Sequence, residues 1–96
     1  MKTTEAIKKS IASRRDDFFQ KYSIKSLAIF GSFARHEQNE DSDLDLMVEF
    51  NRSVGSEFIQ LADELEEFLG FKVDLVSRNG IKQKYYDRIK DELIYV

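Results

Sequence analysis

Two aspartates separated by one residue form the part of this sequence with the most obvious chemical use. They lie in the segment Ser42-Asp43-Leu44-Asp45-Leu46, where polar and apolar residues alternate. Side chains at positions i and i+2 of a β-strand point to the same face, so Asp43 and Asp45 could share one hard cation or bridge two. Mg²⁺ prefers oxygen ligands of this kind. The alternative is a half-exposed strand with an acidic outer face, which costs stability unless a cation neutralises it.

A third aspartate, Asp74, interrupts the largely apolar segment 71–76. If Val73 and Leu75 face the core, Asp74 points to the opposite face. It would then lie near the first two aspartates if the two strands are neighbours. Taken alone, an aspartate at this position is also typical of a solvent-facing residue, so its interpretation depends on the other carboxylates.

The dipeptide Gly31-Ser32 ends the apolar segment 26–30 and precedes a short helix predicted over residues 32–36. Glycine lets the backbone approach a ligand closely, and free N–H groups at the start of a helix attract anions such as phosphate. Taken alone, the dipeptide also fits a plain turn. Its spacing of eleven residues from Ser32 to Asp43 makes the combined pattern far more specific than either half.

Helices and strands are predicted to alternate along the chain and to carry these residues at strand ends. The order α-β-α-β-α-β-α indicates an α/β (α+β) fold with helices on a sheet. Thr3 or Thr4 could cap the first helix, Ser56 could cap the third, and Gly70 could end it. The predicted helices cover residues 4–20, 32–36, 57–69 and 81–92, and the predicted strands cover 26–30, 44–50 and 71–76, with 93–96 as a short terminal strand or a packed end.

Length and composition restrict the class of protein. The 96 residues, 42% hydrophobic and 34% charged, predict one soluble domain over residues 1–96 with no room for a second lobe. The absence of cysteine excludes thiolate metal sites and fits the cytoplasm. No apolar run approaches the roughly 20 residues that span a bilayer, so no membrane contact is expected. Segment 37–50 holds six acidic residues and no Lys or Arg, which concentrates negative charge around the Asp43–Asp45 pair.

The segment Gly31-Ser32-Phe33-Ala34-Arg35-His36-Glu37, followed by Ser42-Asp43-Leu44-Asp45-Leu46-Met47-Val48, resembles the signature of the DNA polymerase β-like nucleotidyltransferase superfamily. The sequence is most similar to its smallest branch, the MNT (minimal nucleotidyltransferase) proteins, over nearly the whole chain. The resemblance implies the polymerase β-like nucleotidyltransferase fold, a small mixed sheet flanked by helices. It also implies transfer of a nucleoside monophosphate, with AMP from ATP as the expected case. The only histidine, His36, is interpreted as a surface residue.

The resemblance implies a role for each matching residue. Asp43, Asp45 and Asp74 would ligate two Mg²⁺ ions, and Asp74 would also help to deprotonate the attacking hydroxyl. Gly31 and Ser32 would hold the β- and γ-phosphates of the nucleotide. Two metal ions at such a site stabilise both the attacking and the leaving oxygen of an in-line displacement.

Two further residues are expected to support the site. Arg35 lies one helical turn after Ser32 and is interpreted first as a partner for a carboxylate such as Glu37 or Asp43, and second as a phosphate contact. Ser42 is expected to order its loop or to cap it rather than to touch the substrate.

The acceptor must be presented by a partner or by another copy of the chain, because the domain has no room for an acceptor-binding lobe. The resemblance implies a HEPN protein, since MNT proteins are commonly paired with HEPN proteins in toxin–antitoxin modules and some transfer AMP onto a HEPN tyrosine. Two alternatives stay open: an antitoxin that neutralises its partner by binding alone, and nucleotidyl transfer to RNA or a small molecule. Nucleic acid is the weaker acceptor, because the basic residues form no stripe and the net charge is −3.

Overall fold

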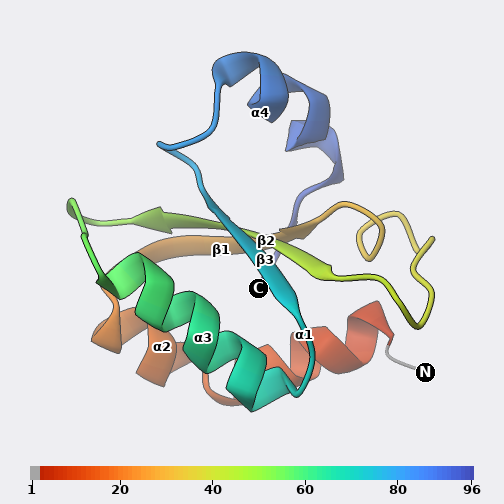
Figure 1. Ribbon diagram of the computed structural model, residues 1–96, viewed down its shortest axis with the longest axis horizontal. Helices are drawn as coiled ribbons and strands as arrows, with labels where there is room; N and C mark the ends of the chain where they lie inside the picture. The colour runs from red at the N-terminus through yellow and green to blue at the C-terminus, as the bar shows by residue number, and fades with distance from the viewer. Residues whose placement is uncertain (1–2) are drawn as a thin grey trace.

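The computed structural model describes residues 3–96, so Met1 and Lys2 of the predicted domain lie outside the described residues. Within residues 3–96, no helix is long and apolar enough to cross a bilayer. The helices are α1 (Thr4–Ser13), α2 (Arg15–Lys21), α3 (Glu57–Leu69), α4 (Gln83–Ile89) and the 3₁₀ helix η1 (Lys90–Glu92), and the strands are β1 (Ile24–Phe30), β2 (Leu44–Phe50), β3 (Val73–Ser77) and β4 (Ile94–Tyr95) (Figure 1).

The strands form one mixed sheet with the order β3-β2-β1-β4. Strand β1 pairs antiparallel with β2 and with the short β4, whereas β2 pairs parallel with β3. The parallel pair is joined through α3, as a crossover connection requires. The α/β class with a small mixed sheet and flanking helices, expected from the sequence, is therefore confirmed.

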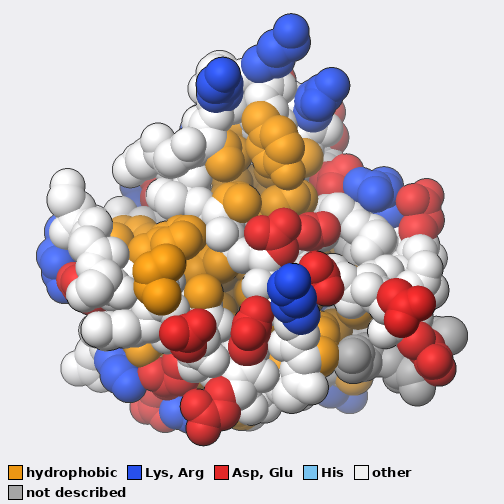
Figure 2. Space-filling model, in the orientation of Figure 1, with side chains coloured by type: hydrophobic (Ala, Val, Ile, Leu, Met, Phe, Trp, Pro, Cys, Tyr) orange, Lys and Arg blue, Asp and Glu red, His pale blue; other side chains and the backbone are white. Residues whose placement is uncertain are grey.

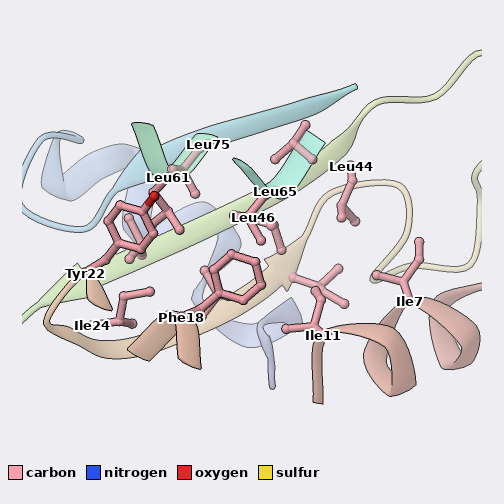
Figure 3. Packing of buried hydrophobic residues seen from close by; sticks show 14 of the residues in the cluster. Ile7, Ile11, Phe18, Tyr22, Ile24, Leu44, Leu46, Leu61, Leu65 and Leu75 are labelled. Carbon is pink, nitrogen blue, oxygen red and sulfur yellow. The ribbon is translucent and has the colours of Figure 1, made fainter. Parts of the chain in front are cut away.

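Helices α1, α2 and α3 cover one face of the sheet and enclose the main core (Figures 1 and 3). Alternate residues of β2 point into this core, and full burial of such side chains stabilises the fold by about 1.5–3 kcal/mol each. Figure 3 shows Leu44 and Leu46 of β2 facing side chains of the helices. The largest fully buried hydrophobic side chains of this cluster are Phe18, Phe33, Ile11, Leu27, Ile29, Leu44, Leu46, Leu61, Leu65 and Val48.

The opposite face of the sheet carries a smaller apolar cluster beneath α4. Its buried members are Phe30, Met47 and Ile89, from β1, β2 and α4. In Figure 1, α4 and η1 lie on this side of the sheet, away from α1 to α3. Because Asp45 alternates with Leu44 and Leu46, it projects on this second face, on the side of α4 and η1.

The single helix predicted over residues 4–20 is wrong, because the chain bends at Arg14 and forms α1 and α2 instead. Arg14 adopts φ −128°, outside the helical range. The Ser13 hydroxyl bonds back to the carbonyl of Ser10, which competes with regular helix geometry. The bend places the Arg14 guanidinium over the rings of Phe18 and Phe68. The expected cap is present, since the Thr3 side chain accepts a bond from the N–H of Ala6.

The short helix predicted over residues 32–36 is also wrong, because this segment forms hydrogen-bonded turns. The N–H of Arg35 bonds to the carbonyl of Gly31, and the N–H of Glu37 bonds to the carbonyl of Ser32. His36 then takes a φ of +58°, a left-handed conformation that ends any helical propagation. His36 is exposed, as expected.

The ends of several other elements also differ from the predictions. Ser56 makes no side-chain cap, because its backbone is already helical with φ −62° and ψ −18°. The last helix is shorter than predicted, since α4 gives way to η1 at residue 90. Strand β1 starts two residues early, and β3 spans residues 73–77 rather than 71–76. Gly70 does end α3, with φ +82°.

Candidate active site

The parallel pairing of β2 with β3 brings two of the predicted carboxylates together. Asp45 and Asp74 are register partners on these neighbouring strands. Val73 and Leu75 are buried while Asp74 is exposed, so Asp74 points away from the main core to the same face as Asp45. The sequence predicts that Asp74 lies near the first two aspartates only if its strand is a neighbour of β2, and β3 is that neighbour.

Burial and neighbouring charge perturb Asp45 strongly. The pKa of its carboxyl is raised to about 6, first because burial disfavours the charged form. The negative charge of Asp74, a hydrogen bond with Asp74 and the charge of Asp43 act in the same direction, and Arg35 partly offsets them. Asp43 itself is exposed and immediately precedes β2, so it lies at the open edge of this group.

Gly31 follows the last residue of β1 and has a backbone that other residues rarely adopt. Its φ is +75°, and a Cβ atom there would clash with the Oδ2 atom of Asp45. Glycine is therefore required here for two reasons: it adopts the left-handed φ without strain, and it leaves room for the Asp45 carboxylate. Since Phe30 is the register partner of Asp45, the end of β1 and the start of β2 place the glycine turn against the carboxylates.

Arg35 pairs with the carboxylates of Glu37 and Glu92 rather than with the three candidate aspartates. Its Nε atom bonds to Glu37 at 3.1 Å, and its Nη1 atom bonds to Glu92 at 3.1 Å. Hydrogen bonds with Glu37 and then Glu92 raise the pKa of the guanidinium. The expected pairing with Glu37 is thus present, and no contact between Arg35 and Asp43 is seen within the described residues.

The remaining predicted residues organise the loop. The Ser42 hydroxyl accepts a bond from the N–H of Asn39 at 3.0 Å, which agrees with an ordering role. Ser32 is half-buried, and its carbonyl accepts the N–H of Glu37. Neither serine contacts the carboxylates through a recorded bond.

Two residues from the C-terminal part of the chain reach this site without having been anticipated. The Glu92 carboxylate accepts the N–H of Gly31 at 2.5 Å. Tyr85 of α4 is 40% exposed and meets Phe30 edge-on. Burial and then the charges of Asp45, Asp74 and Glu92 raise the pKa of its hydroxyl. Both contacts join residues more than fifty positions apart, and no local spacing in the sequence could have indicated them.

The surface near the site combines opposite properties. In Figure 2, acidic side chains gather over the middle of the sheet, directly below an apolar patch that lies over α4. A basic side chain lies among the acidic ones, and further basic side chains lie above the apolar patch in this view. An acidic group beside an apolar surface could bind a cation-bound nucleotide next to an acceptor.

The carboxylates fit a magnesium ion, although they do not form a complete cage. Among residues 3–96, no three acidic or histidine side chains converge into a ready metal site. Mg²⁺ is bound in proteins through one or two carboxylates, with waters and substrate phosphates completing its shell. Burial first, and then the negative charges of Asp74 and Asp43, raise the pKa of Asp45, and a bound divalent cation would relieve the repulsion among these carboxylates. Ligation by all three aspartates stays a prediction.

Comparison with known proteins identifies the class of domain. Residues 9–96 match the family model of the nucleotidyltransferase domain. A protein of Methanocaldococcus jannaschii named as a candidate protein adenylyltransferase is 44% identical over 100 residues, and the match covers all of both chains. The protein adenylyltransferase MntA of Thermococcus cleftensis is 32% identical over 97 residues, covering all of this chain and 98% of that protein.

Solved structures share the fold. One described as a candidate minimal nucleotidyltransferase superposes with a TM-score of 0.78 at 31% identity, covering 97% of this chain and 95% of that one. The MNT antitoxin complex with a tri-AMPylated HEPN toxin from Shewanella oneidensis matches with a TM-score of 0.64 at 16% identity. That match covers 86% of this chain and 66% of the other, and at this identity it shows the fold alone.

Proposed function

Because this chain belongs to the nucleotidyltransferase domain family, and within it to the MNT branch, we propose that the enzyme transfers AMP from ATP to a hydroxyl of a partner protein. The observation that carries the proposal is the pairing of Asp45 with Asp74 beside the glycine turn at Gly31. Relatives of the same length are named protein adenylyltransferases, which supports ATP as donor and a protein as acceptor.

The residues on the α4 face would divide the work of this reaction. Asp43, Asp45 and Asp74 would hold Mg²⁺, which when bound supplies stabilisation of the charge that develops on the phosphate oxygens. Gly31 and Ser32 would hold the β- and γ-phosphates. Arg35 would add positive charge at the same turn, where a guanidinium is suited to phosphate oxygens.

The transfer itself would form one bond and break one. The acceptor oxygen bonds to the α-phosphorus of ATP, and the bond from that phosphorus to the oxygen bridging to the β-phosphate breaks. Pyrophosphate leaves with the electron pair of that bond. Asp74, which is exposed, would accept the hydroxyl proton. Most of the rate enhancement would come from positioning and electrostatics.

The proposed partner is a HEPN toxin, and the proposed biological role is that of an antitoxin. The support is the fold shared with an MNT antitoxin bound to an AMPylated HEPN toxin. A cytoplasmic location agrees with a chain that has no cysteine. The acceptor hydroxyl would be presented by this partner, or by a second copy of the chain.

The test is to incubate the protein with MgATP and the HEPN-type protein expected from the adjacent gene, and then to measure the mass of that partner protein by mass spectrometry. Adenylyl additions are expected with the wild type and with Glu49→Gln, and none with Asp45→Asn. Glu49 is a matched control because it lies on β2, carries the same charge and pairs with Lys25 instead of the site. Identical spectra from the wild type and Asp45→Asn, with no adduct from either, would show that the enzymatic proposal is wrong.

A second assay separates catalysis from binding. Cells that express the toxin would receive the wild type or the double variant Asp43→Ala, Asp45→Ala. Loss of protection is expected if transfer neutralises the toxin. Full protection by the double variant would favour a binding antitoxin, and AMP incorporation into RNA or a small molecule without any protein partner would favour the other alternative.

A further inference from the structure

The carboxylate of Glu92 occupies the turn at which the nucleotide phosphates are proposed to bind. Glu92 is the last residue of η1, and only Leu93 separates it from β4. It accepts the N–H of Gly31 at 2.5 Å, and both of its oxygens lie 3.1 Å from Nη1 of Arg35. Only 20% of the side chain is exposed, so the contact is shielded on most sides.

The groups that hold Glu92 are those that an anionic ligand needs. A backbone N–H and a guanidinium both form short, strong hydrogen bonds with carboxylate and with phosphate oxygens. The N–H of Gly31 cannot donate fully to Glu92 and to a phosphate at once. The negative charge of Glu92 also lies on the same face as Asp45 and Asp74, where it adds to the repulsion that an incoming triphosphate must overcome.

We propose that Glu92 stands in the place of a nucleotide phosphate oxygen at Gly31 and Arg35, and that the nucleotide must displace it in order to bind. Glu92 thereby lowers the affinity for the triphosphate and favours release of pyrophosphate. This inference rests on the proposed function, since it concerns the same turn. Glu92 is thus a competitor, supplied by the chain itself, for the site at which the nucleotide phosphate binds.

The surroundings of Glu92 let its side chain leave without disrupting the fold. Strand β4 stays paired with β1 through its own backbone, in the registers Ala28 with Tyr95 and Ile29 with Ile94. On the other side of η1, Ile89 is buried against the sheet. The segment is therefore anchored before and after Glu92, and displacement requires only that one side chain rotate away.

The experiment measures binding of AMP-PNP with Mg²⁺ by isothermal titration calorimetry to the wild type, Glu92→Gln and Glu92→Ala. We expect both variants to bind several-fold to about tenfold more tightly, and a tenfold change corresponds to about 1.4 kcal/mol. Thermal unfolding without nucleotide should show that both variants melt at a lower temperature than the wild type, because both lose the charge-assisted pairing with Arg35 and Glu92→Ala also loses the hydrogen bond from Gly31. Lower stability together with tighter binding is the signature of a competing contact.

Two control variants locate the effect. Asp91→Asn removes one charge from the same 3₁₀ helix at an exposed position, and it should leave the affinity unchanged. Glu37→Gln removes the other partner of Arg35 without touching Gly31, so its gain should be smaller than that of Glu92→Gln. If Glu37→Gln and Glu92→Gln gain equally in affinity for AMP-PNP, the competition does not take place at the Gly31 amide.

The outcomes separate this inference from the proposed function. If the wild type binds AMP-PNP and the Glu92 variants bind equally well or more weakly, the competitor role is wrong while the proposed function stands. If the wild type and the variants all fail to bind AMP-PNP, both are overturned. Tighter binding in the Glu92 variants alone supports both.

Discussion

Replacing Asp45 with asparagine should stabilise the protein at neutral pH while removing its activity. The surroundings of Asp45 disfavour its charged form, since burial, the charge of Asp74 and the charge of Asp43 raise its pKa from 3.8 to about 6. Asparagine has nearly the same shape and no charge. The substitution therefore removes an electrostatic cost that the folded protein carries for its site.

The cost can be estimated from the size of the pKa shift. A shift of about two units corresponds to about 3 kcal/mol at 1.36 kcal/mol per unit. Because Asp45 is only partly buried, solvent screening reduces the expected gain to about 1 kcal/mol. For a domain of this size, that gain raises the melting temperature by about 4–8 °C.

The sign of the pH dependence follows from the raised pKa. The folded state binds the Asp45 proton more tightly than the unfolded chain does, so this contribution to stability is fully present below the unfolded pKa and is lost as the pH rises through about 6. Asp45→Asn should therefore exceed the wild type in melting temperature at about pH 8, and the two should converge below about pH 4.

The assay is thermal unfolding followed by circular dichroism in EDTA, at both pH values, with Glu49→Gln as the control on the same strand. Adding Mg²⁺ at the higher pH should raise the melting temperature of the wild type more than that of Asp45→Asn, because a ligand that binds only the folded state stabilises it. A variant that is less stable at the higher pH, or a difference that does not change with pH, would refute the reasoning.

Two further predictions concern Gly31 and Glu64. Gly31→Ala should lower stability by more than about 2 kcal/mol and abolish transfer, because it combines a left-handed φ with a clash, whereas Gly70→Ala has the same φ problem in open space and should cost only about 1–2 kcal/mol in urea unfolding. Glu64→Gln should lower stability by about 1 kcal/mol at neutral pH, since Glu64 accepts bonds from Lys21 and from the buried Tyr22 hydroxyl. Hydrogen bonds from Lys21 and Tyr22 lower the pKa of Glu64, so this difference should shrink as the pH falls from the ordinary pKa of the carboxyl and disappear below its lowered folded-state pKa; a loss that persists in strong acid would contradict it.

Local patterns in the sequence were sufficient to predict the elements that carry the carboxylates. The alternation over residues 44–50 predicts β2 with its correct bounds and places Asp45 opposite the core. The same argument applied to Val73 and Leu75 predicts the outward direction of Asp74. Such patterns are strong because each buried face requires a long run of consistent residues.

The errors and omissions concern conformations that no periodicity encodes. The left-handed His36 and the non-helical Arg14 interrupt segments that the sequence predicts as continuous helices. The contact of Glu92 with Gly31 depends on how the last segment returns along β1, and a sequence separation of 61 residues gives no spacing rule from which to predict it.

The register of β2 against β3 has a consequence for how the protein can fail. Strand side chains alternate with a period of two, so a slip of β3 by one residue would turn Asp74 into the hydrophobic core and expel Leu75 from it. The carboxylate pair and the core on the reverse face therefore form in one event. A chain that has buried Leu75 beside Leu46 has already assembled its two acids, and a mispaired chain has neither.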